Sequence, residues 1–464
     1  MKIDNFLMIC LILLNLIVVY IFSADQTHEK LIILSWLGLC QFCASILFRI
    51  KKGHNIIDPF ILFLVCLYVF SMGQCLMYPF GIHTDRDLLG FLGISEIEIF
   101  SALCYTNISL ALFYLGINIS SIYYIKENNP TKNFKIYTDS SLKRTRAIGV
   151  FFLVLSIIPH YYYLISDVWL SLRFGYGAIY EQTEKIGVDN FFVLVGKYYI
   201  PALICLFIYY RKQNKIILVI ESLLGLDAVI MLIGGGRSGA VVIIGLLLIL
   251  HNFLICKYNK RKTLIIVICG LILTCLLAFI SHIRSDANRS LGTMQVNIEK
   301  NLLTDAVAEM GSTMFCLIKS QDIIPNDEPY RYGKTYLYSL TTIIPNLGFW
   351  KVHPAKLESN MSEWLTEKLN LNYGSGFSMC AETYVNFGNF GVLVFIIFGV
   401  IIGKIFTLFE KNIYENKYPE VVFSFILFYF IMFLPRNDFI SLARGVFFYA
   451  LPFFVYIKGI AVKK

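Results

Sequence analysis

The chain has 464 residues, of which 57% are apolar and 15% are charged, and its mean hydropathy is +0.67. Soluble domains carry roughly 25% charged residues, so this composition excludes a soluble globular enzyme and a disordered chain. The net charge of +9 is compatible with a nucleic-acid partner. It is equally compatible with the asymmetric distribution of basic residues that membrane proteins show.

Twelve apolar runs are candidates for membrane spans, since a helix needs about 20 apolar residues to cross the bilayer core. The first run follows a weakly charged start and lacks a cleavage site of small residues, so we interpret it as a retained span. The predicted fold class is all-α, a polytopic membrane protein with about 12 transmembrane helices. The runs are 6–22, 31–48, 59–79, 99–122, 147–165, 191–210, 216–233, 240–256, 263–281, 388–407, 420–434 and 443–457.

Basic residues alternate along the connections between these runs. The short outer loops contribute only Lys30, Arg86, Arg237 and Arg436, one each. Every second connection is rich in Lys and Arg, so the positive-inside rule predicts that both termini are cytoplasmic. This topology accounts for most of the net charge, and we expect no nucleic-acid partner. The basic stretches are 49–52, 126–146, 211–215, 257–262 and 458–464.

One outer connection, 282–387, is far longer than the others. The sequence therefore predicts three parts: spans one to nine in 1–281, a large extracytoplasmic loop in 282–387, and spans ten to twelve in 388–464. Long loops on a compact scaffold usually carry function. Apolar residues at helical spacing predict amphipathic helices near 295–320 and 356–369. These helices either lie on the membrane surface or pack on each other.

The sharpest local feature is the Gly-Gly-Gly-Arg-Ser-Gly stretch at 234–239, between the seventh and eighth spans. Three glycines allow a tight turn with exposed N–H groups, and Arg237 then begins a helix whose dipole favours anions. One interpretation is a phosphate site at the outer membrane face. The other is a tight helical hairpin whose arginine extends to the interface.

Further arginines are expected on the same side. Arg284 and Arg289 follow the ninth span, Arg436 lies between the last two spans, and Arg444 begins the last one. Arginine near membrane depth is costly and usually has a partner, and its guanidinium suits bidentate phosphate contacts. Each arginine taken alone can also be interpreted as an ordinary residue at the membrane–water interface. Together with Arg237, the set predicts a binding site for an anionic lipid or a diphosphate.

Two carboxylates are candidates for a general base. Glu382 lies among small and aromatic residues just before the tenth span, with no Lys or Arg within ten residues, so we expect poor solvation and a raised pKa. Glu309 lies on the predicted loop helix and is the second choice. Each is alternatively a capping or interfacial glutamate. His353 is a weaker candidate, because a lone loop histidine is more often structural or solvated.

The twelve cysteines predict no disulfide framework and no metal site. Ten of them lie in or beside apolar runs, where a thiol behaves as a small hydrophobe, and no pair has metal-ligand spacing with a nearby His. Cys316 and Cys380 lie outside the spans, and we expect two buried free thiols rather than a bond. No cofactor is expected.

Several of these features together resemble the O-antigen polymerase (Wzy) family. They are the twelve spans, the Gly-Gly-Gly-Arg-Ser-Gly stretch, the large late loop, and Gly-Phe-Ser-Met-Cys-Ala-Glu-Thr-Tyr-Val-Asn-Phe-Gly at 376–388. Tyr-Arg-Tyr-Gly-Lys-Thr-Tyr at 330–336, followed by Ile-Ile-Pro at 343–345, is similar to the family as well. The resemblance covers most of the chain in layout and these short motifs in sequence.

The resemblance implies a glycosyltransferase C-like enzyme of the bacterial inner membrane that polymerises undecaprenyl-diphosphate-linked oligosaccharide repeat units. Its product would be O-antigen, capsule or exopolysaccharide. The arginines Arg237, Arg284, Arg289, Arg436 and Arg444 would stabilise the leaving diphosphate without a metal. Glu382, or else Glu309, would act as the base. The implied partners are membrane lipids, a chain-length regulator and a flippase.

Two other functions remain open from the sequence. An O-antigen ligase would share the architecture and differ in its acceptor, and it would be expected to use a loop histidine, for which His353 is the candidate. A lipid-linked oligosaccharide flippase would also have about twelve spans. A flippase would be expected to carry polar residues along mid-span faces and to have short, balanced loops. Here the polar groups gather at the outer face and in one loop, which favours an enzyme.

Overall fold

The computed structural model describes residues 2–21, 26–84, 87–127, 139–174, 188–285, 302–344, 346, 349–371 and 373–459. In these ranges every regular element is a helix and no strand occurs, so the predicted all-α fold class is confirmed. Eleven described segments are long and apolar enough to cross a membrane. The twelfth expected span, 263–281, coincides with α11 (Lys260–Ser285), whose side chains from residue 274 onward are outside the described set.

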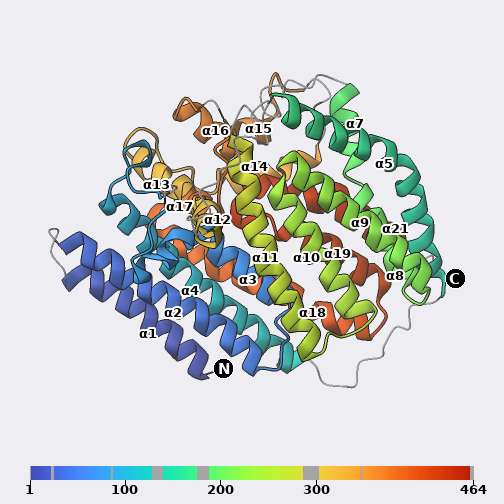
Figure 1. Cartoon of the computed structure of the whole chain (residues 1–464), viewed down its shortest axis with the longest axis horizontal. Coiled ribbons are helices and arrows are strands. Elements are labelled where there is room, and N and C mark those ends of the chain that lie inside the picture. The colour runs from blue at the N-terminus through green and yellow to red at the C-terminus, as the bar shows by residue number, and fades with distance from the viewer. Residues whose placement is uncertain are drawn as a thin grey trace. The chain divides into compact units, whose positions relative to one another are not determined.

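The helices form two compact units, each described here by itself. The first unit comprises Met1–Lys132, Asn301–Thr407 and Leu434–Ala443. Figure 1 shows α1, α2 and α4 side by side in this unit. Its α-helices are α1 (Lys2–Ile21), α2 (Thr27–Lys51), α3 (Pro59–Met72), α4 (Glu96–Glu127), α12 (Leu302–Gly311), α13 (Met314–Ile323), α14 (Lys334–Leu340), α15 (Pro354–Ser359), α16 (Met361–Lys368), α17 (Met379–Phe387), most of α18 (Val394–Tyr414) and most of α20 (Phe439–Arg444).

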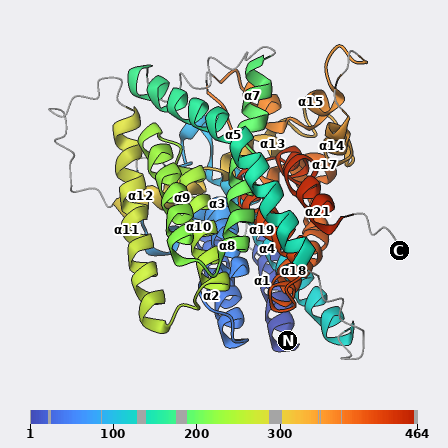
Figure 2. The same ribbon diagram turned by 90° about the vertical axis from the view of Figure 1, so that its right-hand side faces the viewer.

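The second unit comprises Asn133–Lys300, Leu408–Phe433 and Arg444–Lys464. Within it α9 packs against both α8 and α10, as Figure 2 shows. Its α-helices, besides α11 and the end of α18, are α5 (Asp139–Phe174), α7 (Val188–Gly196), α8 (Tyr199–Tyr210), α9 (Asn214–Gly234), α10 (Arg237–Leu254), α19 (Tyr418–Ile431) and α21 (Leu451–Lys458). The connection 166–190 between the fifth and sixth expected spans starts inside α5, and its residues 175–187 lie outside the described set.

Buried amides connect the first helices of the first unit. The side-chain nitrogen of Asn107 donates to the side-chain oxygen of Asn15 at 2.8 Å and to the carbonyl of Leu34 at 3.0 Å. The side-chain nitrogen of Gln41 donates to the Tyr68 hydroxyl at 3.1 Å and to the Asn107 carbonyl at 3.0 Å. Polar side chains in hydrocarbon gain stability from such partners on neighbouring helices. The contacts therefore fix α1, α2, α3 and α4 against one another.

Two glycines allow α4 and α18 to approach closely. A Cβ at Gly116 would overlap the carbonyl of Ile396, and a Cβ at Gly399 would overlap the carbonyl of Phe113. Small residues at such crossings let helix backbones touch, which is a main source of helix association in membranes. The crossing leaves no room for any side chain at either position.

We therefore expect Gly399→Ala to lower the Tm of the purified protein, because overpacking of a helix crossing costs about 1–3 kcal/mol. Gly245→Ala in α10 is the matched control, since no atom lies within 4 Å of a Cβ built there. Thermal unfolding in detergent, followed by size-exclusion chromatography, measures the difference. Equal Tm values for the two variants would show that the crossing tolerates a methyl group.

The first loop helix differs from its prediction. The expected helix at 295–320 is interrupted, because α12 ends at Gly311 and α13 begins at Met314, and residues 295–301 are outside the described set. The hydroxyl of Ser312 donates to the Glu309 carbonyl at 2.6 Å, and that of Thr313 donates to the Met310 carbonyl at 3.0 Å. Such local bonds compete with the helical pattern and end α12.

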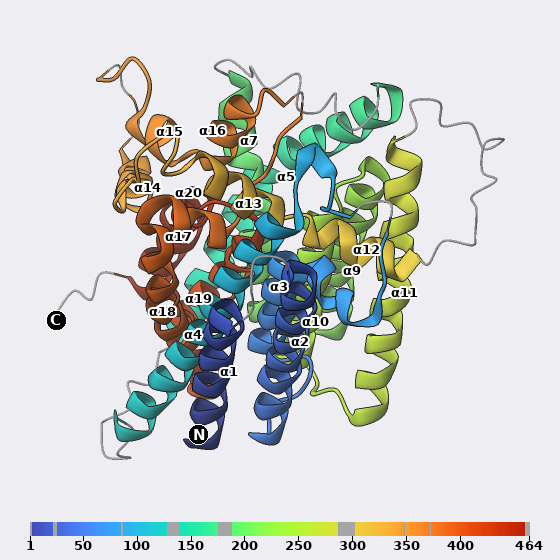
Figure 3. The same ribbon diagram turned by 90° about the vertical axis from the view of Figure 1, so that its left-hand side faces the viewer.

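The second loop helix is interrupted as well. The expected helix at 356–369 consists of α15 and α16, separated at Asn360, whose ψ of 77° is not helical. Leu317 of α13 is 1% exposed and Leu365 of α16 is 0% exposed, so these two helices bury their apolar faces in the protein. This burial agrees with packing within the protein for α13 and α16, whereas Leu303 of α12 and Leu357 of α15 are 39% and 63% exposed. Figure 3 shows α13 to α17 gathered at the end of the unit opposite the N-terminus of α1.

Candidate functional site

Helix α17 places Glu382 inside the first unit. The helix begins after Ser378, whose hydroxyl accepts a hydrogen bond from the backbone N–H of Ala381 at 3.1 Å. A serine in this position satisfies one of the free N–H groups of the first turn. Glu382 follows in that turn and is 1% exposed, so its expected removal from solvent is confirmed.

Both carboxylate oxygens of Glu382 accept hydrogen bonds from distant segments. Thr335 of α14 donates its hydroxyl to Oε1 at 2.7 Å, and the backbone N–H of Phe439 at the start of α20 donates to Oε2 at 2.7 Å. The carboxylate therefore joins α14, α17 and α20. Each oxygen keeps a second lone pair, because a carboxylate offers about four acceptor sites.

Asn386 determines the direction of the Thr335 hydrogen bond. The Asn386 side-chain oxygen accepts from the Gly333 N–H at 2.9 Å, which fixes the orientation of the amide. Its nitrogen then donates to the Thr335 oxygen at 2.7 Å and to the Glu382 carbonyl at 2.8 Å. Because Thr335 Oγ1 accepts from Asn386, its own hydrogen is directed to Glu382. We call Glu382, Asn386, Thr335 and the Phe439 N–H the Glu382 cluster.

A left-handed turn brings Thr335 to this cluster. Tyr332 and Gly333 have φ angles of 49° and 84°, and glycine is the residue that adopts such angles readily. The N–H groups of Arg331 and Tyr332 donate to the carbonyls of Val385 and Asn386 at 3.0 and 2.9 Å. The segment before α14 is thus paired with the end of α17, which explains why two motifs far apart in sequence meet.

Arg331 supplies a positive charge beside the cluster. Its guanidinium donates to the Glu358 carbonyl at 3.0 Å, lies 5.2 Å from the Trp364 ring, and interacts electrostatically with Glu382. Burial lowers the pKa of Arg331 from its ordinary value, and the carboxylates of Glu328 and Glu358 oppose this effect. Arginine stays protonated at physiological pH regardless.

Glu328 interacts with both Arg331 and the Trp364 ring beneath it. Its carboxylate accepts from the Trp364 indole N–H at 3.1 Å and forms an ion pair with Lys368 at 2.5 Å. Burial favours the neutral form of Glu328, but the bonds from Lys368 and Trp364 are stronger in sum and hold its pKa below the usual range. Glu328 is therefore ionised and fixes the Trp364 ring under Arg331.

Arg436 belongs to the same unit as Glu382. It lies three residues before Phe439, whose N–H binds Glu382, so both residues are carried by the short segment 434–443. Its side chain is exposed, and its guanidinium lies 5.8 Å from the Phe70 ring centre. A cation on an aromatic face keeps its donor groups available to a ligand.

The glycine-rich stretch forms a helical hairpin in the second unit. Gly235 has a φ of 88°, its N–H donates to the Leu232 carbonyl at 3.0 Å, and the Gly236 N–H donates to the Met231 carbonyl at 2.8 Å. This pattern is a Schellman motif that ends α9. Two glycine N–H groups are thus used by the turn itself, which favours the hairpin interpretation of the glycines. Arg237 is half-buried at the first position of α10.

Arg444 and Arg284 also lie outside the first unit. Arg444 is exposed at the end of α20 and counts with the second unit, as Arg237 does. Arg284 lies in α11, but its side chain is outside the described set, and Arg289 is outside it entirely. The structure therefore brings together Glu382 and Arg436 in one unit, and leaves the diphosphate site as a prediction.

The alternative bases occupy different surroundings. Glu309 is half-buried in α12. His353 caps α15, since its Nδ1 accepts from the Ala355 N–H at 3.1 Å and its Nε2 lies 2.9 Å from the Ile344 carbonyl. Both ring nitrogens of His353 are therefore used, in agreement with the structural interpretation of this residue.

The two cysteines outside the predicted spans are free and buried, as expected. The Cys380 thiol lies 3.7 Å from the Ser71 hydroxyl, and the Cys316 thiol lies 3.6 Å from the Ser375 carbonyl. Among the described residues, no group of three or more His, Cys, Asp or Glu side chains is placed to hold a metal ion.

Sequence reasoning selected Glu382 but gave no role to Thr335, Asn386 or Arg331. One signal was available for Asn386, because it follows Glu382 by four residues and so shares its helix face. Thr335 and Arg331 lie in the Tyr-Arg-Tyr-Gly-Lys-Thr-Tyr stretch, whose residue types alone indicate no role for either residue. Their proximity to Glu382 depends on long-range pairing that no local pattern reveals.

Comparison with known protein families gives a match over most of the chain. The family model described as O-antigen polysaccharide polymerase Wzy matches residues 5–462, which is nearly the whole chain. Neither the curated proteins nor the solved structures give a match.

Proposed function

Because the chain belongs to the O-antigen polysaccharide polymerase Wzy family, we propose that it is a membrane glycosyltransferase that polymerises undecaprenyl-diphosphate-linked oligosaccharide repeat units. The product is a surface polysaccharide, either O-antigen, capsule or exopolysaccharide. The observation that carries this proposal is the family match over residues 5–462, on a chain with eleven described apolar helices long enough to cross a membrane.

In the proposed reaction, the growing chain on one lipid diphosphate is the donor. A hydroxyl at the non-reducing end of a new lipid-linked unit attacks the anomeric carbon of that chain. The new glycosidic bond forms while the bond to the diphosphate breaks, and lipid diphosphate leaves with the electron pair. Glu382 takes the proton of the hydroxyl, with Glu309 as the second choice. Arginines stabilise the charge of the leaving diphosphate, so the reaction needs no metal.

The proposed location is the bacterial inner membrane, with both termini in the cytoplasm. The alternation of basic and non-basic connections supports this orientation. It puts the segment from α12 to α17, which carries the Glu382 cluster, on the outer side. The proposed partners are the lipid-linked glycans, membrane lipids, a chain-length regulator and a flippase.

The decisive experiment uses the purified full chain in nanodiscs with lipid-linked repeat units isolated from the strain that encodes it. We expect products of two or more repeat units, detected by mass spectrometry, and the same products in the presence of EDTA. Unextended substrate would contradict the polymerase proposal. Translocation of the same lipid across proteoliposomes, without extension, would instead identify a flippase. Loss of extension with EDTA would contradict only the metal-independent mechanism.

A further inference from the structure

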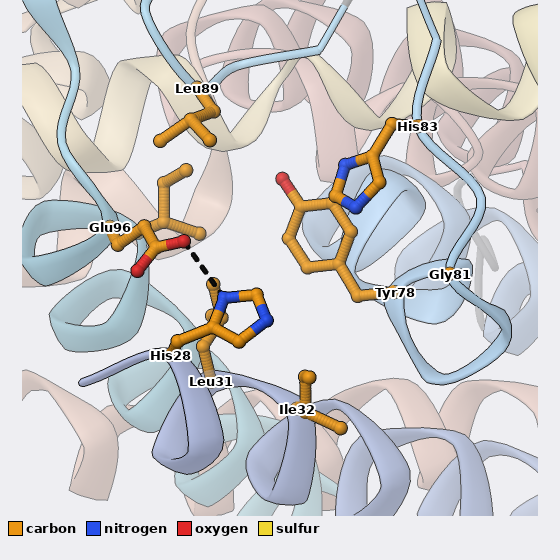
Figure 4. Close-up of a pocket in the computed structure, with 9 residues that line it drawn as sticks. His28, Leu31, Ile32, Tyr78, Gly81, His83, Leu89 and Glu96 are labelled. Carbon is orange, nitrogen blue, oxygen red and sulfur yellow. Dashed lines mark hydrogen bonds and ion pairs between the residues drawn. The ribbon is translucent and has the colours of Figure 1, made fainter. Parts of the chain in front are cut away.

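A cavity outside the Glu382 cluster lies between the first turns of α2 and α4 and the segment that follows η3 (Tyr78–Phe80). Its floor is apolar and buried, with Leu31 4% exposed and Ile99 0% exposed. Figure 4 shows His28 and Glu96 on one side of the cavity and Tyr78 and His83 on the other. The cavity thus has an apolar floor between two polar walls.

Each polar wall is a histidine paired with a carboxylate. His28 Nδ1 lies 2.9 Å from Glu96 Oε1, and His83 Nδ1 lies 3.0 Å from Asp87 Oδ2. The Tyr78 hydroxyl donates to the other oxygen of Asp87 at 2.6 Å, and the Tyr78 ring stacks on His83 with the ring centres 5.4 Å apart. These bonds orient both imidazoles through Nδ1. The Nε2 atoms and the second Glu96 oxygen stay available for a ligand.

The volume of the cavity suits part of one small molecule. It is about 80 Å³, and a single water needs roughly 10–15 Å³ on the same measure. The enclosed space therefore holds on the order of five to eight heavy atoms. That is about half of a six-membered sugar ring with its hydroxyl groups, and the open mouth leaves room for the rest of a chain.

The cavity lies beside the segment that carries the Glu382 cluster. Lys319 of α13 forms an ion pair with Glu98 of α4 at 3.3 Å, two residues after the cavity residue Glu96. The rings of Phe91 and Phe315 are in contact with centres 5.6 Å apart. Both contacts join α13 to the cavity wall within the first unit. Because α13 also packs against α17, the cavity wall and the helix that carries Glu382 are connected through α13.

We infer that this cavity, which we call the sugar pocket, is a subsite that takes about half of one sugar ring of the glycan and leaves the rest of the ring at its mouth. A pyranose ring presents apolar C–H faces and equatorial hydroxyls, and the pocket offers an apolar floor with imidazole and carboxylate acceptors at its sides. A phosphate is disfavoured by the negative charges of Glu96 and Asp87. A lipid tail is disfavoured by the two polar walls. The inference rests on the proposed function, since it places part of the glycan substrate of that reaction at a second site, away from Glu382.

The test measures binding of a defined probe to the full chain in nanodiscs. The probe is the repeat-unit oligosaccharide released by mild acid from the strain's own lipid-linked pool, and isomaltotetraose is the comparison sugar. Isothermal titration calorimetry gives the Kd. Tryptophan fluorescence is a second readout, because Trp36, one of four tryptophans, follows the cavity residue Ile32 by one helical turn and its ring lies 5.5 Å from that of Phe80.

Two variants alter the sugar pocket and one serves as the control. Ile32→Phe fills the space, and Glu96→Gln weakens the bond that orients His28. We expect each to raise the Kd about tenfold, because Ile32→Phe takes up the space of the sugar ring and Glu96→Gln removes the charge that strengthens the polar contacts of this wall. Ile97→Phe adds the same bulk at a position that is 63% exposed and next to Glu96, and it should leave the Kd unchanged.

The outcomes separate the pocket from the proposed function. Unchanged binding in both pocket variants would overturn the sugar pocket, and so would binding of the probe only after addition of Zn²⁺. The proposed function is judged by chain extension of lipid-linked repeat units. Normal extension with unchanged binding would reject the pocket alone, whereas absence of extension in the unmodified protein would reject the function itself.

Discussion

Glu382→Gln is expected to abolish chain extension while the protein stays folded. Loss of a general base lowers a rate by roughly 10²–10⁴-fold, and glutamine cannot accept the proton. The glutamine amide oxygen can still accept from the Phe439 N–H, and its nitrogen can donate to the Thr335 oxygen, so the three segments stay joined. Extension of lipid-linked repeat units in nanodiscs measures the effect, and size-exclusion chromatography and Tm verify the fold.

Two further variants distinguish a role of Glu382 as the general base from a role as a structural anchor between α14, α17 and α20. Thr335→Val removes the hydroxyl that binds Glu382 but leaves the carboxylate, and Glu382→Ala removes both oxygens. If Glu382 is the base, Glu382→Gln loses activity at normal Tm, and Thr335→Val retains part of it. If Glu382 only anchors the segments, Glu382→Gln makes long chains at the normal rate. In that case Glu309→Gln becomes the next variant to test.

The sequence predicted the membrane helices because their signal is local. A run such as 31–48 or 216–233 is apolar along its length, and nothing but a helix satisfies its backbone in hydrocarbon. The corresponding helices, α2 and α9, extend a few residues beyond these bounds. The loop helices were predicted with the correct type but without their breaks. One break depends on the side-chain hydrogen bonds of Ser312 and Thr313, and the other on the backbone angle of Asn360. The spacing of apolar residues carries no information on either.

The same distinction between local signals and long-range contacts applies to the candidate site. Burial of Glu382 followed from its neighbours in sequence, most of which are small, apolar or aromatic. Its partners could not be predicted, because Thr335 is 47 residues away and Phe439 is 57 residues away. A hydrogen bond between such segments depends on how the chain folds back, and the bond to Phe439 uses a backbone N–H that any residue type would provide. The sequence hints are the glycine of the turn at Tyr332 and Gly333 and the spacing of four residues between Glu382 and Asn386.

Glu382 has hydrogen-bond partners within the protein, whereas the arginines are proposed to bind the diphosphate of the substrate. Diphosphate recognition uses charge together with the planar fork of the guanidinium, so lysine preserves only the first of these properties. Arg436 is the most informative position, because its exposed guanidinium lies 5.8 Å from the Phe70 ring centre and shares a segment with Phe439. Arg237 is the second, at the start of α10, and Arg444, Arg284 and Arg289 complete the series.

We expect Arg436→Ala and Arg237→Ala each to lower the rate of chain extension by roughly 10²–10³-fold, the usual loss when one donor to a developing negative charge is removed. The corresponding Lys variants should recover only a small part, because they keep the charge and lose the bidentate contact. Arg261→Lys is the matched control, since Arg261 is an exposed arginine on a connection predicted to be cytoplasmic. Extension is measured at saturating acceptor, with protein levels equalised. A rate equal to that of the unmodified protein in Arg436→Ala or Arg237→Ala would remove that residue from the diphosphate site, and full recovery in the Lys variant would reduce its role to charge alone.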